Sequence, residues 1–104
     1  MVGESSSYGV GVPAFWIGYI EVPPSIEAKI RTRRSVTGDQ VRAACQWPAE
    51  PLRAAWDEHP EYGRRLVVYA RDEQNRLLKV VLQPVDIAGG TYRLRTVVVG
   101  TRGA

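Results

Sequence analysis

The sequence predicts a single α+β domain in which two N-terminal helices pack on one face of a mostly antiparallel sheet of four to five strands. Two observations support this prediction. Residues 64–99 contain three apolar segments separated by turn-forming residues, as in consecutive antiparallel strands. Residues 24–47 contain helix-start signals followed by apolar residues at helical spacing. The expected order is β-α-α-β-β-β-β, with residues 12–104 as the domain and the Gly- and Ser-rich residues 1–11 as a flexible arm.

The first strand is expected at residues 15–22, where aromatic and β-branched residues run up to Pro23. A first helix begins at Pro24, because proline is favoured at the first helical position. Ile26 and Ile30 lie four residues apart on one face of this helix, and basic residues occupy most of the remainder. We therefore expect a short, basic helix.

A second helix begins after Thr37, because Thr37 and Gln40 have the spacing of a capping box. Its buried stripe comprises Val41, Ala44 and Cys45. Cys45 is therefore interpreted as a small core residue. Pro48 is expected to end the helix.

Residues 52–57 are interpreted as a further strand with Leu52, Ala54 and Trp56 inward, and residues 57–63 as an acidic turn. A carboxylate in that turn can orient the imidazole of His59 and raise its basicity, which indicates a general base. The alternative is an exposed turn that merely collects polar residues.

The central hairpin pairs residues 64–71 with residues 77–83 across a polar loop. If Arg71 lies opposite Leu77, then Tyr69 lies opposite Lys79. Alternation then sends one set of side chains from the two strands into a common core: Leu66, Val68, Ala70, Leu78, Val80 and Leu82. A last strand at residues 92–99 is expected to add Tyr92, Leu94, Thr96 and Val98 to that core.

Alternation also collects basic and polar residues on the other face of the sheet. They are Arg65, Tyr69, Arg71, Lys79, Gln83, Arg93 and Arg95. This face is either a binding surface for a polyanion or an ordinary solvated face. Residues 64–104 hold eight basic and three acidic residues, whereas residues 1–63 hold six and eight, and this segregation favours the polyanion.

Composition narrows the function classes further. A net charge of +3 favours nucleic acid or an acidic protein as partner. The single cysteine excludes an intramolecular disulfide, and with a single histidine we expect no metal site and no cofactor. We find neither a membrane span nor a signal sequence, so we expect a soluble, cytoplasmic protein with no membrane partner.

Four short motifs resemble the BrnT-type and RelE-type bacterial toxins, small ribonucleases of toxin–antitoxin pairs. They are Thr37-Gly38-Asp39-Gln40-Val41, Gly63-Arg64-Arg65-Leu66, Leu77-Leu78-Lys79-Val80-Val81 and Tyr92-Arg93-Leu94. The resemblance covers roughly residues 15–99. It implies a RelE-like fold, RNA as substrate, a cognate antitoxin as partner, and Arg65 and Arg93 at the RNA-facing surface.

The expected activity is metal-independent RNA cleavage on the basic face, with Arg65 and Arg93 holding the phosphate. Tyr69 and Lys79, opposite each other, are the candidates for proton transfer. Four more arginines are expected to bind RNA: Arg33, Arg34, Arg71 and Arg95. The tryptophans Trp16, Trp47 and Trp56 have the chemistry to stack on bases, but in a domain this small they are expected in the core. The alternative function is a non-catalytic domain, a degenerate toxin, whose basic face binds an acidic protein or nucleic acid.

Overall fold

The computed structural model describes residues 15–48 and 52–100. Its elements in chain order are strand β2 (Tyr19–Glu21), helices α1 (Pro24–Arg34) and α2 (Gly38–Gln46), and strands β3 (Arg53–His59), β4 (Gly63–Arg71), β5 (Leu77–Asp86) and β6 (Thr91–Val99). The expected arm at residues 1–11 lies outside the described residues.

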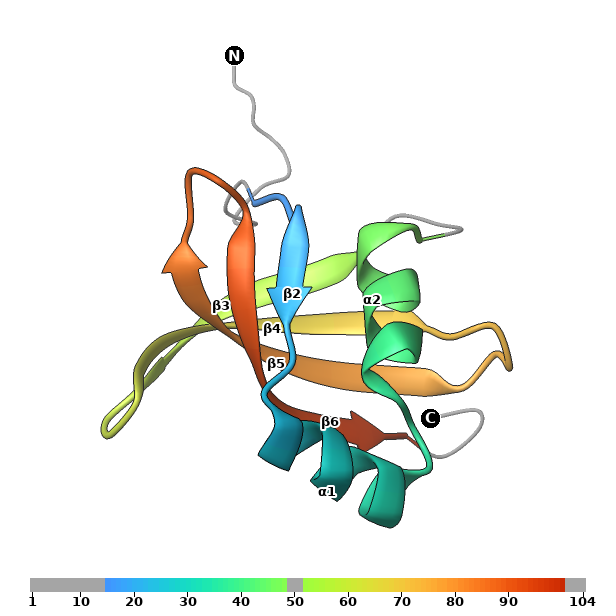
Figure 1. Cartoon of the computed structure of the whole chain (residues 1–104). Helices are drawn as coiled ribbons and strands as arrows, with labels where there is room; N and C mark the ends of the chain where they lie inside the picture. The colour runs from blue at the N-terminus through green and yellow to red at the C-terminus, as the bar shows by residue number, and fades with distance from the viewer. Residues whose placement is uncertain (1–14, 49–51, 101–104) are drawn as a thin grey trace.

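The strands form one sheet in the order β2-β6-β5-β4-β3. Strand β2 runs parallel to β6, and every other neighbouring pair is antiparallel, so the sheet is mixed. Helix α1 packs mainly against β6, whereas α2 packs against β4 and β2 and crosses in front of the central strands (Figure 1). The predicted α+β class, with two helices and a mostly antiparallel sheet, is confirmed.

The core lies between the helices and one face of the sheet. Buried side chains from the helices, Ile30, Val41, Ala44 and Cys45, meet the inward side chains of the central hairpin. The predicted register is confirmed, because Tyr69 pairs with Lys79. The opposite face of the sheet carries no helix in the described chain, and we call it the open face.

Strand β6 differs from the prediction because a β-bulge interrupts its alternation. Val81 pairs with Thr96 while its neighbour Leu82 pairs with Leu94, so one strand has an extra residue at this point. Beyond the bulge the faces are exchanged: Val97 is fully buried and Val98 is exposed. The prediction that Thr96 and Val98 enter the core is therefore wrong, because an inserted residue reverses every side chain that follows it.

Strand β2 is shorter than the expected residues 15–22. The backbone amides of Gly18 and Tyr19 both donate to the carbonyl oxygen of Gly90, at 2.8 and 3.1 Å, so regular pairing starts only at Tyr19. Pro23 ends the strand region, and Pro24 is the first residue of α1, as predicted. The predicted Thr37–Gln40 capping box is also present at the start of α2.

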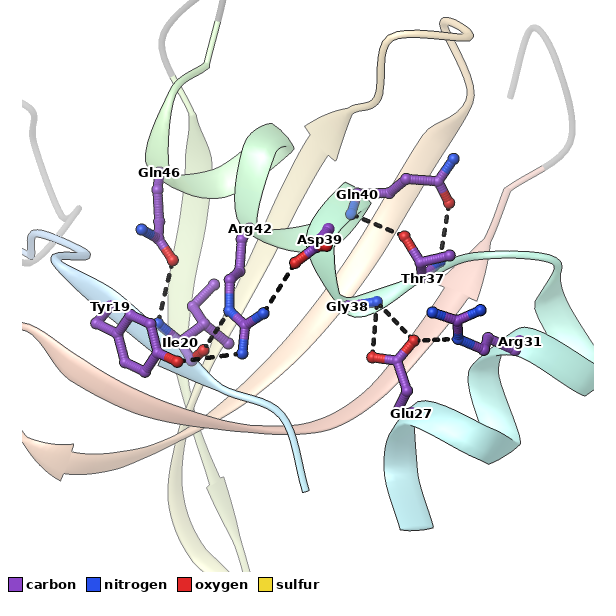
Figure 2. Close-up of polar contacts among 10 residues, drawn as sticks. All are labelled: Tyr19, Ile20, Glu27, Arg31, Thr37, Gly38, Asp39, Gln40, Arg42 and Gln46. Atoms are coloured by element: carbon purple, nitrogen blue, oxygen red, sulfur yellow. Dashed lines mark hydrogen bonds and ion pairs between the residues drawn. The ribbon is translucent and has the colours of Figure 1, made fainter. Parts of the chain in front are cut away.

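Side chains of α2 cover the outer edge of β2 (Figure 2). Gln46 accepts from the Ile20 amide and donates to the Gly18 carbonyl, both at 3.2 Å. Arg42 donates through Nε to the Ile20 carbonyl at 2.9 Å and stacks on the Tyr19 ring. Because these bonds satisfy the free backbone groups of β2, this edge of the sheet is closed.

Candidate nucleic-acid interface

The open face is strongly basic. Its cations come from four strands: Arg53 on β3, Arg65 and Arg71 on β4, Lys79 on β5, and Arg93 and Arg95 on β6. Three carboxylates share this face in the described chain: Glu21 and Asp57 are each ion-paired with an arginine of this face, and Asp86, at the end of β5, accepts from the Gly89 amide. Four of the six cations therefore have no carboxylate partner among residues 15–48 and 52–100, which leaves a net positive surface.

A hollow of about 300 Å³ opens on this face over strands β3, β4 and β5. It is lined by Ala55, Trp56, Asp57, Arg65, Val67, Tyr69, Lys79 and Val81. The apolar floor comes from Val67 and the buried Val81, which pair across β4 and β5. The polar residues stand around this floor, so the hollow combines an apolar base with ionisable walls.

Asp57 holds Arg65 at one side of the hollow. The two residues are direct partners in the β3–β4 ladder, and Nη2 of Arg65 donates to Oδ2 of Asp57 at 2.8 Å. The side chain of Arg65 is only 21% exposed, and its Nε has no hydrogen-bond partner in the described chain. The guanidinium is thus oriented by a carboxylate, and its Nε is a buried donor without a partner among the described residues.

Three of the four predicted catalytic residues line the hollow together: Arg65, Tyr69 and Lys79. The fourth, Arg93, is on β6, where Nη2 and Nε donate to Oε1 of Glu21 at 3.1 and 3.2 Å. It belongs to the same face but not to the hollow.

The predicted RNA-binding arginines divide between the two sides of the sheet. Arg71 lies at the end of the hairpin, where it donates to the Asn75 carbonyl at 3.1 Å, and Arg95 lies 5.9 Å from the centre of the Tyr62 ring. Both belong to the open face. Arg33 and Arg34 are exposed in the last turn of α1, in the helix layer. The structure therefore does not bring these two arginines to the basic face, because Ile30 turns α1 against the opposite side of the sheet.

The acidic turn predicted at residues 57–63 is not a general-base cluster. Asp57, Glu58 and His59 belong to β3, where alternation places Asp57 and His59 on one face and Glu58 on the other. Among the described residues no hydrogen bond joins either carboxylate to the imidazole, because Asp57 accepts from Arg65. Nδ1 of His59 accepts from the backbone amides of Glu61 and Tyr62, at 3.0 and 3.1 Å, so the imidazole closes the turn. The turn interpretation of His59 is the one that its contacts support.

Sequence reasoning missed the position of Asp57 in the hollow and the pairing of Glu21 with Arg93. The first could have been found by extending the β3–β4 hairpin back from a turn at residues 60–62, which places Asp57 opposite Arg65. The second depends on β2 lying parallel beside β6. A parallel pairing between strands far apart in sequence leaves no local signal.

The aromatic residues also depart from expectation. Trp56 is half-buried against the core, but Trp16 and Trp47 are exposed, so the prediction of core positions for those two is wrong. Cys45 is buried as predicted, and burial raises the pKa of its thiol to about 12, which makes it a poor nucleophile.

No helix in the described residues is long and apolar enough to cross a membrane. Residues 15–48 and 52–100 contain no group of three His, Cys, Asp or Glu side chains arranged to bind a metal ion. Comparison of the chain with protein-family models, with curated proteins and with solved structures finds no match.

Proposed function

We propose that the open face binds single-stranded RNA and cleaves it at the hollow, as a metal-independent ribonuclease toxin of the RelE-like class. The observation that carries the proposal is the gathering of Arg65, Tyr69 and Lys79 around one hollow within a basic face. The toxin class and a cognate antitoxin come from the motif resemblance alone.

Binding follows from the charge and shape of the face. Phosphates are held by exposed cations such as Lys79 and Arg71, and each contact releases counterions. Tyr69 is 40% exposed beside the hollow, so its ring has a free surface on which a base can stack. A single strand suits this surface, because stacking requires a base that is not already paired.

Cleavage would use the ribose 2′-hydroxyl as nucleophile. Its oxygen forms a bond to the adjacent phosphorus while the bond from phosphorus to the 5′ oxygen breaks, which yields a 2′,3′-cyclic phosphate and a free 5′-hydroxyl. One group takes the 2′ proton and another protonates the leaving oxygen, and Tyr69 and Lys79 are direct cross-strand partners at this point. Arg65, oriented by Asp57, would stabilise the extra charge on the phosphorane.

The second candidate function is a non-catalytic binding domain. It is favoured by a specific observation: Arg65 and Arg93 are already neutralised by carboxylates of this chain, and the imidazole of His59 is engaged in its turn. A face whose other cations have no carboxylate partner in the described chain, and whose histidine is engaged in a turn, can bind an acidic protein without catalysing a reaction. The antitoxin itself would be such a partner.

Binding is tested by fluorescence anisotropy with a labelled single-stranded RNA at several salt concentrations. We expect Lys79→Gln to weaken binding and to reduce the steepness of the log–log salt dependence by about 0.7, because one phosphate contact is lost. Arg33→Gln is the matched control, since it removes one exposed positive charge from the helix layer. Equal losses from the two substitutions would show that only net charge matters, and would contradict binding at the open face.

Cleavage is tested with the same RNA in the presence of a chelator. Arg65→Lys keeps the positive charge but loses the planar fork that spans two phosphate oxygens. We expect it to retain binding within a few-fold while cleavage falls by about 10²-fold or more, the scale of removing one preorganised donor. Wild-type protein that binds RNA but does not cut it would leave the binding domain as the function. Wild-type protein that does neither would favour an acidic protein partner.

A further inference from the structure

The two edge strands of the sheet, β2 and β3, differ in whether their outward backbone groups have hydrogen-bond partners. At the β2 edge, Gln46 and Arg42 satisfy the outward backbone groups. At the other edge, no residue of 15–48 or 52–100 outside β4 makes a backbone hydrogen bond with β3. Strand β3, seven residues long, therefore has outward backbone donors and acceptors that no residue of the described ranges uses.

Strand β3 lacks several features that prevent natural edge strands from pairing with a strand of another chain. It contains no proline, glycine or lysine, and its register with β4 is continuous from Arg53 to His59 without a bulge. The helices pack chiefly against β2, β4 and β6. As a result Leu52, Ala54 and Trp56 form a row of half-buried apolar side chains beside this edge.

The sequence of β3, Arg-Ala-Ala-Trp-Asp-Glu-His, is self-complementary in one antiparallel register. Directly opposed residues of antiparallel strands share a face. The twofold axis of a symmetric pair must therefore lie between the two copies of one residue, which face each other. With the axis at Ala55, Arg53 of each copy faces Asp57 of the other on the open face. On the core face the small Ala54 is opposite the large Trp56, which extends the apolar row across the junction.

The neighbouring registers lack this match. An axis at Ala54 places Arg53 opposite Ala55, and an axis at Trp56 places Asp57 opposite Ala55, so the charges have no cross-strand partner. An axis at Asp57 opposes two carboxylates, which is unfavourable. Arg53 makes no ion pair with any described residue of its own chain, and Asp57 uses only Oδ2 for Arg65, so both are available for this contact.

We propose that the chain forms a twofold homodimer through antiparallel β3–β3 pairing centred on Ala55. The two five-stranded sheets become one continuous sheet with the open faces on the same side. Because Ala55 and Asp57 line the hollow, the two hollows adjoin across the axis and present one longer basic surface. The dimer does not depend on the proposed ribonuclease activity.

The oligomeric state is measured by sedimentation velocity over a range of concentrations. We expect the wild-type mass to rise from 11.6 kDa towards twice that value. Ala55→Lys and Ala55→Glu each place two like charges face to face across the axis, at ~5 Å. Each should weaken dimerisation by about tenfold or more, since opposed like charges cost several kcal/mol in an interface.

The matched control is Ala43→Lys, which adds the same charge at an exposed alanine of α2 and should leave the dimer intact. Wild-type protein that stays monomeric at the highest concentration would overturn the proposal. Equal weakening by Ala55→Lys and Ala43→Lys would also overturn it, because the effect would then come from net charge. Circular dichroism of each variant shows whether its fold is retained.

The register is tested by oxidative cross-linking, which does not require a variant that breaks the dimer. Two Ala55→Cys side chains face each other at the axis, within the Cα separation that a disulfide spans. Two Ala54→Cys residues are diagonal neighbours, ~7–8 Å apart, too far for a disulfide without backbone movement. We expect rapid cross-linking only for Ala55→Cys, and native Cys45 is buried and should not react. Cross-linking of Ala55→Cys no faster than of Ala43→Cys would refute the interface, and faster cross-linking of Ala54→Cys would refute the register.

Discussion

Helix α1 is connected to the N-terminus of α2 by the carboxylate of Glu27, and this contact is expected to stabilise the fold. Glu27 on α1 accepts hydrogen bonds from the Gly38 amide through both carboxylate oxygens, at 3.0 and 3.2 Å, and from Nε of Arg31 (Figure 2). Gly38 is the first residue of α2, so Glu27 caps the N-terminus of the neighbouring helix beside the Thr37 capping box. A Cβ at Gly38 would collide with this carboxylate, which explains why glycine fits the position.

The cost of Glu27→Ala can be worked from these contacts. A hydrogen bond to a charged group contributes about 1.5–3 kcal/mol, and an i,i+4 ion pair at the surface about 0.3–0.5 kcal/mol. The Glu27 side chain is 28% exposed, so a total near the lower end, about 2 kcal/mol, is expected for the free energy of unfolding. For a domain of this size that loss lowers Tm by roughly 8–16 °C. Glu27→Gln keeps an acceptor and should cost about 1 kcal/mol.

The effect of Glu27 should depend on pH. Burial alone would raise the pKa of the carboxyl, but the hydrogen bonds from Arg31 and the Gly38 amide outweigh it, so the pKa lies below the ordinary 4.5. A lowered pKa in the folded state means that the carboxylate stabilises the fold above pH 4.5 and loses this contribution as the pH falls through the folded value. The stability difference between wild type and Glu27→Gln should therefore be largest near neutral pH and shrink in acid.

Urea unfolding followed by circular dichroism, repeated from pH 7 down to pH 3, measures this difference. Glu73→Gln is the matched control, because Glu73 is an exposed carboxylate with no ion pair to any described residue. It should change the free energy of unfolding by less than about 0.5 kcal/mol. The reasoning is refuted if Glu27→Gln and Glu73→Gln have the same stability at pH 7, or if the Glu27→Gln difference does not diminish in acid.

Two further outcomes follow from the core and the β2 edge. Because burial raises the pKa of Cys45 to about 12, the thiol of native protein should react with a chromogenic disulfide reagent at pH 8 only as fast as the chain unfolds, and rapid stoichiometric reaction would contradict its burial. Gln46→Ala should lower the free energy of unfolding by about 1–3 kcal/mol, because the Ile20 amide and the Gly18 carbonyl both lose their partner. Unchanged Tm in this variant would show that water replaces the side chain at the β2 edge.

Part of the candidate site could be predicted from the sequence. Alternation alone placed Arg65, Tyr69 and Lys79 on one face, and the hairpin register put Tyr69 opposite Lys79, as the structure has it. Arg33 was grouped with these residues by its charge alone, although α1 lies on the other side of the sheet. Charge identifies a residue type, but the layer in which the residue lies depends on packing.

Local chemistry in the sequence determined most of the secondary structure. The proline at the start of α1, the capping box at Thr37 and the period-two pattern of residues 64–83 each act within a few residues, so each can be recognised without the fold. The tertiary structure decided the rest. The parallel pairing of β2 with β6 and the ion pair between Glu21 and Arg93 join segments distant in the chain. The bulge that turns Val97 inward in place of Val98 depends on how β6 pairs with β5. The contacts that stabilise these features exist only once the sheet has formed. For that reason no local sequence pattern predicts them.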